Sequence, residues 1–175
     1  MPEDPLALET RRRLFAAVED APGLSAREVQ RRAGTAWGET VYHLERLEAG
    51  GVVHRERGSH QDFFFAAKVP LGERTLLRLG RSASVRHILV VLLAGKELTL
   101  REVADRSEMS VSRASIHLRR LLDSGVVHSG RRESLRTFFV ADPDRTARLL
   151  VAYHAGIADL WVERLVDSWA ELFPP

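Results

Sequence analysis

The stretch Met109–Val127, MSVSRASIHLRRLLDSGVV, has the pattern of a helix with a defined start, one apolar side and a defined end. Ser110 is typical of an N-cap, because its hydroxyl can accept a hydrogen bond from the free amides of a first helical turn. The apolar residues that follow recur at helical spacing: Ala114, Leu118, Leu121 and Leu122. Gly125 then favours termination. We predict an amphipathic helix with an exposed polar side.

Beyond this helix the pattern changes from helical to extended. Val126–His128 and Thr137–Val140 are β-prone runs. The polar segment Ser129–Ser134 between them is typical of a hairpin tip. We therefore predict a short β-hairpin with a basic tip directly after the amphipathic helix.

Two further helices are expected upstream of the same helix. Ser84–Leu93 has the apolar spacing of one buried helix face, and we expect Gly95 to end that helix with a left-handed backbone. Thr99 and Glu102 form the pattern of a capping box, in which each side chain bonds a free backbone amide of the other. The short helix that they start extends to about Arg106.

The whole arrangement occurs twice, at an offset of 74 residues. Leu24–Ala67 aligns with Leu98–Ala141 without a gap, and 17 of the 44 positions are identical, where ordinary residue frequencies would give roughly three. A repeat of this length corresponds to one whole small domain. The elements expected in the first copy are a capping box at Ser25 and Glu28, a helix from Thr35 to Ala49, and β-prone runs at Val52-Val53 and Phe63–Phe65.

Three helices followed by a basic-tipped hairpin is the order of a winged helix-turn-helix domain. Met109–Val127 resembles the recognition-helix segment of winged-helix repressors of the ArsR and MarR type, and Gly34–Leu44 resembles a degraded copy of it. The tandem arrangement with a long helical tail is similar to prokaryotic, mainly archaeal, regulators with two such domains. The resemblance covers about Leu14 to Ala141 and, more loosely, the tail. Because winged helices also serve as protein-binding modules, it is more specific for the fold than for the role.

The predicted fold is mainly α with small β-hairpin wings: two tandem winged helix-turn-helix domains and a long C-terminal helix. The expected segments are a first domain at 6–68, a linker with a short helix at 69–83, a second domain at 84–141 and a C-terminal helix at 142–173.

The resemblance implies that the second domain places the first two turns of its recognition helix in the major groove of DNA. Arg113 is suited to a bidentate guanine contact, whereas Arg119 and Arg120 lie further along the helix and are suited to phosphates. Two serines and two apolar residues of the same turns can reach phosphates, bases or a thymine methyl group. The candidate DNA-binding residues of this helix and its wing are Val111, Ser112, Arg113, Ser115, Ile116, Arg119, Arg120, Arg131, Arg132 and Arg136.

The first domain has a weaker DNA-binding pattern. Glu39 stands where the second copy has Arg113, and Gly38 weakens the start of the helix. Trp37 and Tyr42 are more typical of contacts to protein or a ligand than of base contacts. The candidate DNA-binding residues here are Trp37, Arg55 and Arg57, and a packing or partner-binding role is the alternative.

The distribution of charge supports a nucleic-acid-facing second domain more than the total does. The net charge is only +2, but the segment from Arg101 to Arg136 has a balance of +3 and the segment from Pro143 onward one of −2. Of 26 basic residues 24 are arginine, which offers bidentate contacts to phosphate and guanine, although a GC-rich genome would give the same bias. Arg11–Arg13 are expected to be either a phosphate-binding arm or the solvated face of the first helix.

The tail is expected to be one helix of about 30 residues. Asp142-Pro143 is a typical start, with an N-cap followed by proline at the first helical position. Its apolar stripe is Leu150, Tyr153, Ile157, Trp161, Leu165 and Trp169. One small domain cannot cover that much surface, so we expect a dimer interface. Packing on the first domain is the alternative, as is a pseudo-dimer of the two domains of one chain.

Several classes of function are disfavoured. The chain has no cysteine and no catalytic motif, and the repeated histidines at 43, 117, 54 and 128 have no metal-ligand spacing, so we predict no enzyme, metal or cofactor. No apolar stretch approaches the ~20 residues of a membrane-spanning helix, and the N-terminus is too charged for a signal peptide. We expect a cytoplasmic protein with no membrane contact.

We therefore predict a sequence-specific transcriptional regulator that binds double-stranded DNA with its second domain and forms a homodimer. The alternative is a tandem winged-helix scaffold that belongs to a larger protein complex and does not bind specific DNA. A small-molecule effector near Trp37 and Tyr42 is conceivable, but no motif supports one.

Overall fold

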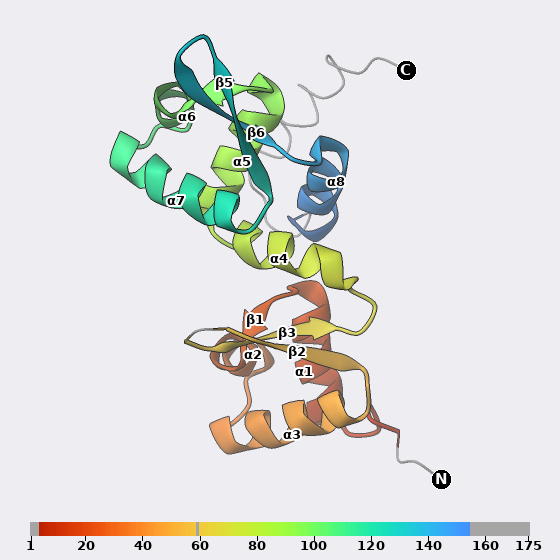
Figure 1. Ribbon diagram of the computed structural model, residues 1–175. Coiled ribbons are helices and arrows are strands. Elements are labelled where there is room, and N and C mark those ends of the chain that lie inside the picture. Colours follow the sequence, from red (N-terminus) through yellow and green to blue (C-terminus); the bar gives the residue numbers. More distant parts are fainter. Residues whose placement is uncertain (1–3, 59, 155–175) are drawn as a thin grey trace. The chain divides into compact units, whose positions relative to one another are not determined.

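The computed structural model describes residues 4–58 and 60–154, and the chain divides into two compact units between Arg78 and Leu79. Each unit contains a bundle of three helices followed by a β-hairpin (Figure 1).

The first unit contains four helices and a three-stranded sheet among its described residues. Its elements are α1 (Glu9–Asp20), β1 (Leu24–Ser25), α2 (Ala26–Ala33), α3 (Trp37–Ala49), β2 (Val53–Arg57), β3 (Asp62–Ala66) and α4 (Leu71–Gly80), the last of which extends across the unit boundary. The sheet is antiparallel in the order β1-β3-β2. Phe64 lies opposite Leu24 on one side and Arg55 on the other.

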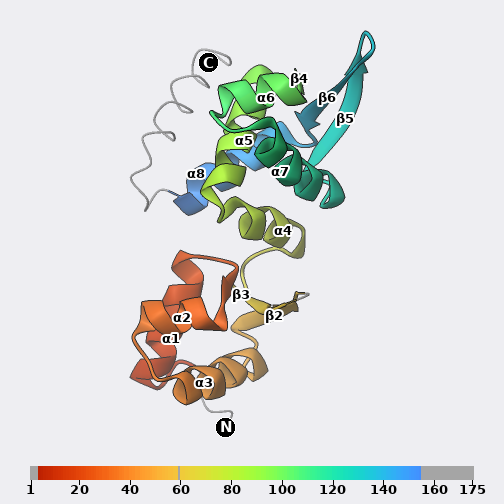
Figure 2. The same ribbon diagram turned by 90° about the vertical axis from the view of Figure 1, so that its left-hand side faces the viewer.

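The second unit repeats this order and adds a helix after the hairpin. Its elements are α5 (Ala83–Gly95), β4 (Leu98–Thr99), α6 (Leu100–Arg106), α7 (Val111–Asp123), β5 (Val127–Arg132), β6 (Leu135–Val140) and α8 (Pro143–His154). The sheet order is β4-β6-β5, with Phe138 opposite Leu98 and Ser129. The hairpin β5–β6 projects beyond the helices as a wing (Figure 2).

Each core consists of one apolar side from every helix and the inner face of the sheet. In the first unit the fully buried side chains include Leu14, Val18, Leu24, Val29, Leu44, Leu47 and Phe65. In the second they include Ile88, Leu89, Leu92, Val103, Leu118, Leu121 and Val127. At most of these positions both repeats bury an aliphatic side chain, whereas Phe65 is fully buried and its equivalent Phe139 is half-buried.

Both predicted capping boxes are confirmed. Ser25 and Thr99 each accept a hydrogen bond from the backbone N–H three residues later, while Glu28 and Glu102 accept from the backbone N–H of the cap residue. The Ser110 cap of α7 is confirmed as well, since its hydroxyl accepts from the Arg113 N–H. These signals are local, and they set the start of each helix correctly.

Four details differ from the predictions. The strands β1 and β4 were not expected, because two residues carry no periodicity and are strands only through their pairing with β3 and β6. The helix α3 begins at Trp37 rather than Thr35. Gly95 is the last residue of α5, and the left-handed conformation belongs to Lys96, with φ 61°. The wing strands continue through most of the predicted tip and leave only Glu133 and Ser134 between them, with Glu133 at φ 59°.

The segment that follows the first wing forms α4, an amphipathic helix. Leu76, Leu77 and Leu79 are buried. Arg74 lies over the ring of Phe65, with its Cζ 5.6 Å from the ring centroid. Arg74 therefore links α4 to β3 of the first unit.

The C-terminal helix is described only as far as His154. Within that part, α8 packs on α5, and Leu150 is buried and Tyr153 half-buried. The remaining four residues of the predicted interface, Ile157, Trp161, Leu165 and Trp169, lie outside the described residues.

Candidate nucleic-acid interface

The second unit has a helix-turn-helix formed by α6 and α7. The turn between them contains Glu108 with φ 54°, a left-handed conformation that reverses the chain. The Met109 N–H donates to the Ala104 carbonyl at 3.0 Å, and the buried Ser107 hydroxyl donates to the Val103 carbonyl. These bonds fix where α7 begins relative to α6.

The residues predicted to contact DNA lie on the exposed side of α7. Ala114, Leu118 and Leu121 face the core, which leaves the opposite side open to solvent. The exposed side chains are Val111, Ser112, Arg113, Ile116, Arg119 and Arg120, and Ser115 is half-buried. The first turn has no acidic residue, and Asp123 in the last turn is the only carboxylate of the helix. The structure therefore brings the predicted residues of this helix together on one basic surface.

The wing contributes two further exposed arginines. Arg131 and Arg136 lie directly opposite each other on β5 and β6. Arg136 donates from Nη2 to the Ser129 hydroxyl at 3.2 Å and lies over Phe138, with its Cζ 5.3 Å from the ring centroid. Within the described residues neither arginine makes an ion pair, so both keep their charge available to an anion.

Arg132 differs from its neighbour Arg131. Its Nη2 lies 3.0 Å from Oε1 and 3.1 Å from Oε2 of Glu102, the acidic residue of the α6 capping box. Hydrogen bonds from the backbone N–H and the hydroxyl of Thr99, together with this arginine, lower the pKa of Glu102 to about 2. Arg132 therefore links the wing to the start of α6, and its guanidinium is already engaged by a carboxylate.

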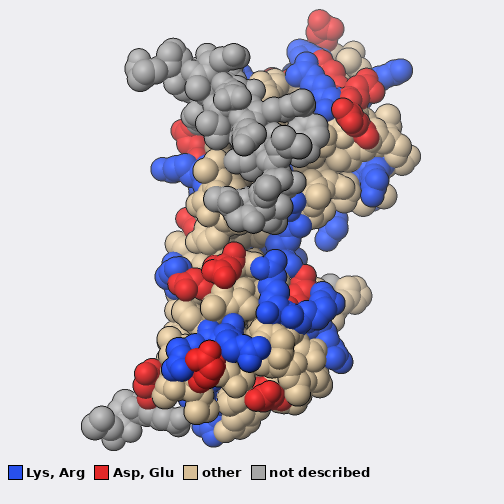
Figure 3. All heavy atoms as spheres, turned by 180° about the vertical axis from the view of Figure 1, so that it is seen from behind, with Lys and Arg blue, Asp and Glu red and all other residues tan. Residues whose placement is uncertain are grey.

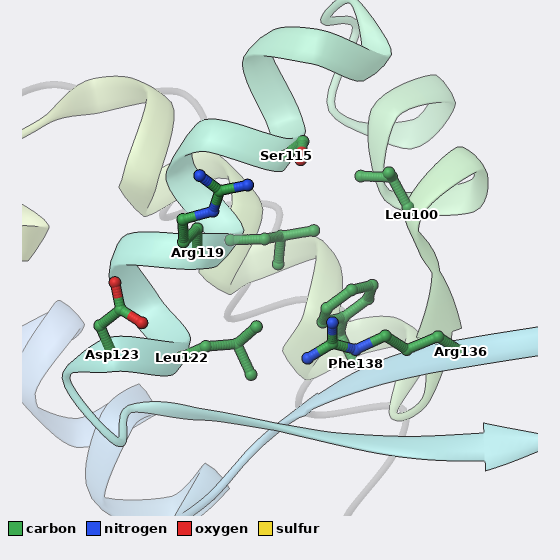
Figure 4. Close-up of a pocket in the computed structure, with 8 residues that line it drawn as sticks. Leu100, Ser115, Arg119, Leu122, Asp123, Arg136 and Phe138 are labelled. Atoms are coloured by element: carbon green, nitrogen blue, oxygen red, sulfur yellow. The ribbon is translucent and has the colours of Figure 1, made fainter.

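A hollow of about 360 Å³ lies between α7 and the wing. Its lining residues are Leu100, Ser115, Leu118, Arg119, Leu122, Asp123, Arg136 and Phe138. Figure 4 shows Arg136 against the ring of Phe138 and reaching toward α7, where Arg119, Leu122 and Asp123 lie. The floor is apolar, and two guanidinium groups and one carboxylate lie at its border.

The recognition helix of the first unit has a different surface. Its exposed residues include Trp37, Tyr42, Glu39 and Glu45. The guanidinium of Arg27 lies 3.7 Å from the centroid of the Trp37 ring, so an arginine already covers one face of that indole. Helix α3 therefore has glutamates where α7 has Arg113 and Arg119, and it keeps an exposed arginine, Arg46, at the position of Arg120.

The two predicted arginines of the first wing have different environments. Arg55 is half-buried, with Nη2 2.7 Å from Oε2 of Glu48 and Nη1 3.8 Å from Oδ2 of Asp62. Arg57 is exposed. Of the pair, only Arg57 is exposed to solvent, whereas Arg55 links α3 to the wing.

The Arg11–Arg13 run is part of α1, and all three of its members bond to backbone carbonyls, Arg11 to that of Pro5. Arg12 donates to the carbonyls of Leu6 and Ala7 and pairs with Glu9, while Arg13 donates to the Ala33 and Gly34 carbonyls at the end of α2. These bonds favour the helix-face interpretation over a free phosphate-binding arm.

The repeated histidines at position 43 and position 117 share one feature, although His43 is buried and His117 is half-buried. Each has an Nδ1 atom that is buried and has no hydrogen-bond partner among the described residues. Burial, followed by the charges of Arg120 and Arg113, lowers the pKa of His117. Within residues 4–58 and 60–154 no group of three or more His, Cys, Asp or Glu side chains could hold a metal ion.

The basic surface is local rather than general. On the face seen in Figure 3, basic and acidic side chains lie among one another over both units. The arginines are nearly balanced by acidic residues over the whole chain. Those of α7 and the second wing therefore matter because they lie together on exposed elements.

Sequence reasoning did not find the hollow or the Arg132–Glu102 pair. Leu100 and Phe138 belong to the core pattern, and their joint position beside α7 depends on the sheet pairing of β4 and β6. Arg132 and Glu102 are 30 residues apart. A comparison of the two repeats gives one indication of the Arg132–Glu102 pair: the first copy has Gly58 where the second has Arg132, so only the second has an arginine at this position.

In each unit a pair of helices, α2 and α3 or α6 and α7, is followed by a β-hairpin, and a short third strand completes the sheet. This arrangement defines two tandem winged helix-turn-helix domains. Comparison with known families agrees. Residues 8–77 match the profile described as an N-terminal HTH domain of the HVO_0163 type, and residues 81–128 match a winged helix-turn-helix DNA-binding profile.

Among solved structures, the chain is similar to the homodimeric winged helix-turn-helix DNA-binding domain of a possible ArsR-family transcriptional regulator from Mycobacterium bovis. The identity is 22%, the match covers 58% of this chain and 86% of that one, and the TM-score is 0.37. No curated protein sequence matches the chain. Among the described residues no helix is both long and apolar enough to cross a membrane.

Proposed function

We propose that this protein is a transcriptional regulator that binds double-stranded DNA through α7 and the wing of its second domain. The observation that carries the proposal is the exposed side of α7, where three arginines face solvent and the first turn has no acidic residue. An α-helix with such a face fits the major groove, and the arginines neutralise phosphates or bind guanine.

Each residue has a role that follows from its place on the helix. Arg113 lies in the first turn and is suited to the two acceptors of a guanine edge. Arg119 and Arg120 lie one and a half to two turns later and are suited to phosphates. The remaining exposed residues of the first turns, Val111, Ser112, Ser115 and Ile116, are suited to base edges and thymine methyl groups.

The wing would contact the backbone or the minor groove beside the site of α7. Arg131 and Arg136 are exposed and unpaired within the described residues, which favours them over Arg132 for this contact. The proposed subunit arrangement is a homodimer held by the C-terminal tail, and it is supported by the apolar stripe of that segment. Dimers of this fold bind two half-sites about one helical turn apart.

The first domain favours a second candidate function, a protein-binding surface. Trp37 is 39% exposed and Tyr42 49% exposed, and Glu39 and Glu45 lie beside them. Such a surface repels phosphate but suits a protein partner, since aromatic residues are enriched in interfaces. A protein that uses only this surface would be the tandem winged-helix scaffold rather than a regulator.

Fluorescence anisotropy with a labelled duplex of random sequence, titrated from 50 to 200 mM salt, tests the proposal. Binding that weakens steeply with salt is the expected result. Selection of tight binders from a duplex library then tests specificity, and light scattering measures the mass in solution. If wild-type protein fails to bind duplex at 50 mM salt, the regulator is refuted and the scaffold is favoured.

Arg113→Ala is the variant that tests base recognition, with Arg148→Ala as its control, because Arg148 is an exposed arginine on α8 outside the proposed interface. Arg113→Ala should lose about 1–3 kcal/mol of discrimination between the selected site and a mutated one. Arg148→Ala should keep the wild-type discrimination. Equal discrimination by both variants would exclude Arg113 from base recognition.

A further inference from the structure

The two domains differ at the place where the recognition helix meets the wing. The offset of 74 residues makes Glu48, Arg55 and Asp62 of the first domain equivalent to Leu122, Ser129 and Arg136 of the second. The strand register agrees, since Arg55 lies opposite Phe64 and Ser129 lies opposite the equivalent Phe138. The same fold therefore contains two different sets of side chains at one position.

In the first domain this place is occupied by the chain's own arginine. Arg55 reaches from β2 to Glu48 at the end of α3 and also lies near Asp62 of β3, at 2.7 and 3.8 Å. Its Cζ is 5.5 Å from the centroid of the Phe64 ring. One guanidinium therefore satisfies two carboxylates and covers the aromatic floor.

In the second domain the charges are inverted and the place is open. Leu122 replaces the glutamate, Ser129 replaces the arginine, and Arg136 replaces the aspartate. Arg136 covers the Phe138 ring as Arg55 covers Phe64, but it bonds to a hydroxyl instead of a carboxylate. The hollow of about 360 Å³ lies here.

The groups around the hollow suit an anion carried on an apolar body. Arg119 and Arg136 make no ion pair within residues 4–58 and 60–154, and Asp123 is the single carboxylate that lines the hollow. Leu118 and Phe138 form an apolar floor that is 1% and 6% exposed. A sugar–phosphate backbone has this combination, because its phosphate takes the guanidinium bonds while the sugar carbons contact apolar side chains.

We propose that the hollow between α7 and the second wing holds the sugar–phosphate backbone of duplex DNA, with Arg119 and Arg136 each neutralising one phosphate, and that the equivalent place in the first domain is closed to phosphate by Arg55. This inference rests on the proposed function and adds which surface holds the backbone and why only one domain has it. Asp123 limits the affinity of the open hollow, since its carboxylate repels the phosphate.

The test is the salt dependence of duplex binding by the full chain. Each phosphate contact contributes about 0.9 to the slope of log K against log salt concentration. The double variant Arg119→Gln/Arg136→Gln should make that slope shallower by about 1.8. The matched control is Arg31→Gln/Arg148→Gln, which removes two exposed arginines that lie outside α3, α7 and both wings, and it should leave the slope unchanged.

A second variant opens the closed place. Glu45→Arg/Glu48→Leu/Arg55→Ser/Asp62→Arg gives the first domain the side chains that the second has at these four positions, including the equivalent of Arg119, and thermal unfolding checks that it folds. The expected result is a slope steeper by about 1.8, because the variant has equivalents of both Arg119 and Arg136. An unchanged slope in this folded variant would overturn the closure by Arg55.

The outcomes separate this inference from the proposed function. If wild-type protein binds duplex and Arg113→Ala weakens specific binding, but the Arg119→Gln/Arg136→Gln variant keeps the wild-type slope, the phosphate site is overturned and the regulator stands. If wild-type protein does not bind duplex, both are overturned. Should the double variant fold poorly, Arg119→Gln alone, on an exposed side chain, should lower the slope by about 0.9.

Discussion

Arg131 and Arg132 are adjacent on β5 and have different environments, so they can separate a residue that contacts DNA from one that holds the wing in place. Arg131 is exposed and unpaired in the described part of the chain, whereas Arg132 is bonded to Glu102 through two oxygens at 3.0 and 3.1 Å. We expect Arg131→Ala to remove a phosphate contact. Arg132→Ala should loosen the wing without removing one.

The magnitude follows from the arginines that the structure leaves available. With Arg113 bound to a base, four arginines remain for phosphates: Arg119, Arg120, Arg131 and Arg136. The expected slope of log K against log salt concentration is about −3.6, a fall of about 150-fold between 50 and 200 mM salt. For Arg131→Ala the slope becomes about −2.7 and the fall about 40-fold. For Arg132→Ala the slope should stay near −3.6, with weaker binding at every salt concentration.

The variant Glu102→Gln should change the affinity for DNA in opposite directions under the two possible roles of Arg132. Glutamine keeps a capping oxygen for α6 but removes the ion pair with Arg132. If Arg132 positions the wing, this variant should bind DNA more weakly. If Arg132 instead contacts phosphate, the loss of its competing carboxylate should strengthen binding. Tighter binding by Glu102→Gln, together with a reduced slope for Arg132→Ala, would refute the reasoning.

Three further outcomes concern stability. The pKa of Glu102 is lowered from 4.5 to about 2, so its charged form stabilises the fold above about pH 4.5. This contribution is lost as the pH falls toward 2. The free energies of unfolding of wild type and Glu102→Gln, measured with denaturant, should therefore differ at pH 6 and converge at low pH. Leu118→Ala should reduce the free energy of unfolding by about 2–5 kcal/mol, since this side chain is 1% exposed, and a loss below 1 kcal/mol in urea titrations would contradict its place in the core. Glu108→Gly should raise the free energy of unfolding by about 0.5–1 kcal/mol because φ at this position is 54°, and a destabilised variant would show that the side chain has another role.

Local signals in the sequence predicted much of the fold. The capping boxes at Ser25 and Thr99 are set by residues three positions apart, so the sequence alone shows them. The strands β1 and β4 depend on distant partners, and the extent of the wing depends on how long two strands stay paired. Neither is visible in a period of apolar residues.

In the candidate site, too, local features could be predicted from the sequence and long-range contacts could not. The exposed residues of α7 follow from helical spacing, because a helix that buries Ala114 and Leu118 must expose Arg113. The partners of Arg55 and Arg132 could not be predicted, since arginine reaches several positions and the sheet register decides which carboxylate is near. A position-by-position comparison of the two copies shows only that their side chains differ at these two arginines, not which carboxylates the arginines pair with.

The opposed arginines of the second wing have a consequence for how this element behaves when it meets DNA. Arg131 and Arg136 face each other across the ladder, and like charges directly opposite are destabilising. A phosphate beside the pair would cancel the repulsion, so backbone amides of β5 and β6 should exchange their hydrogens more slowly in the complex than in the free protein. The free wing, although paired along its whole length, would then be less stable than the wing in the complex.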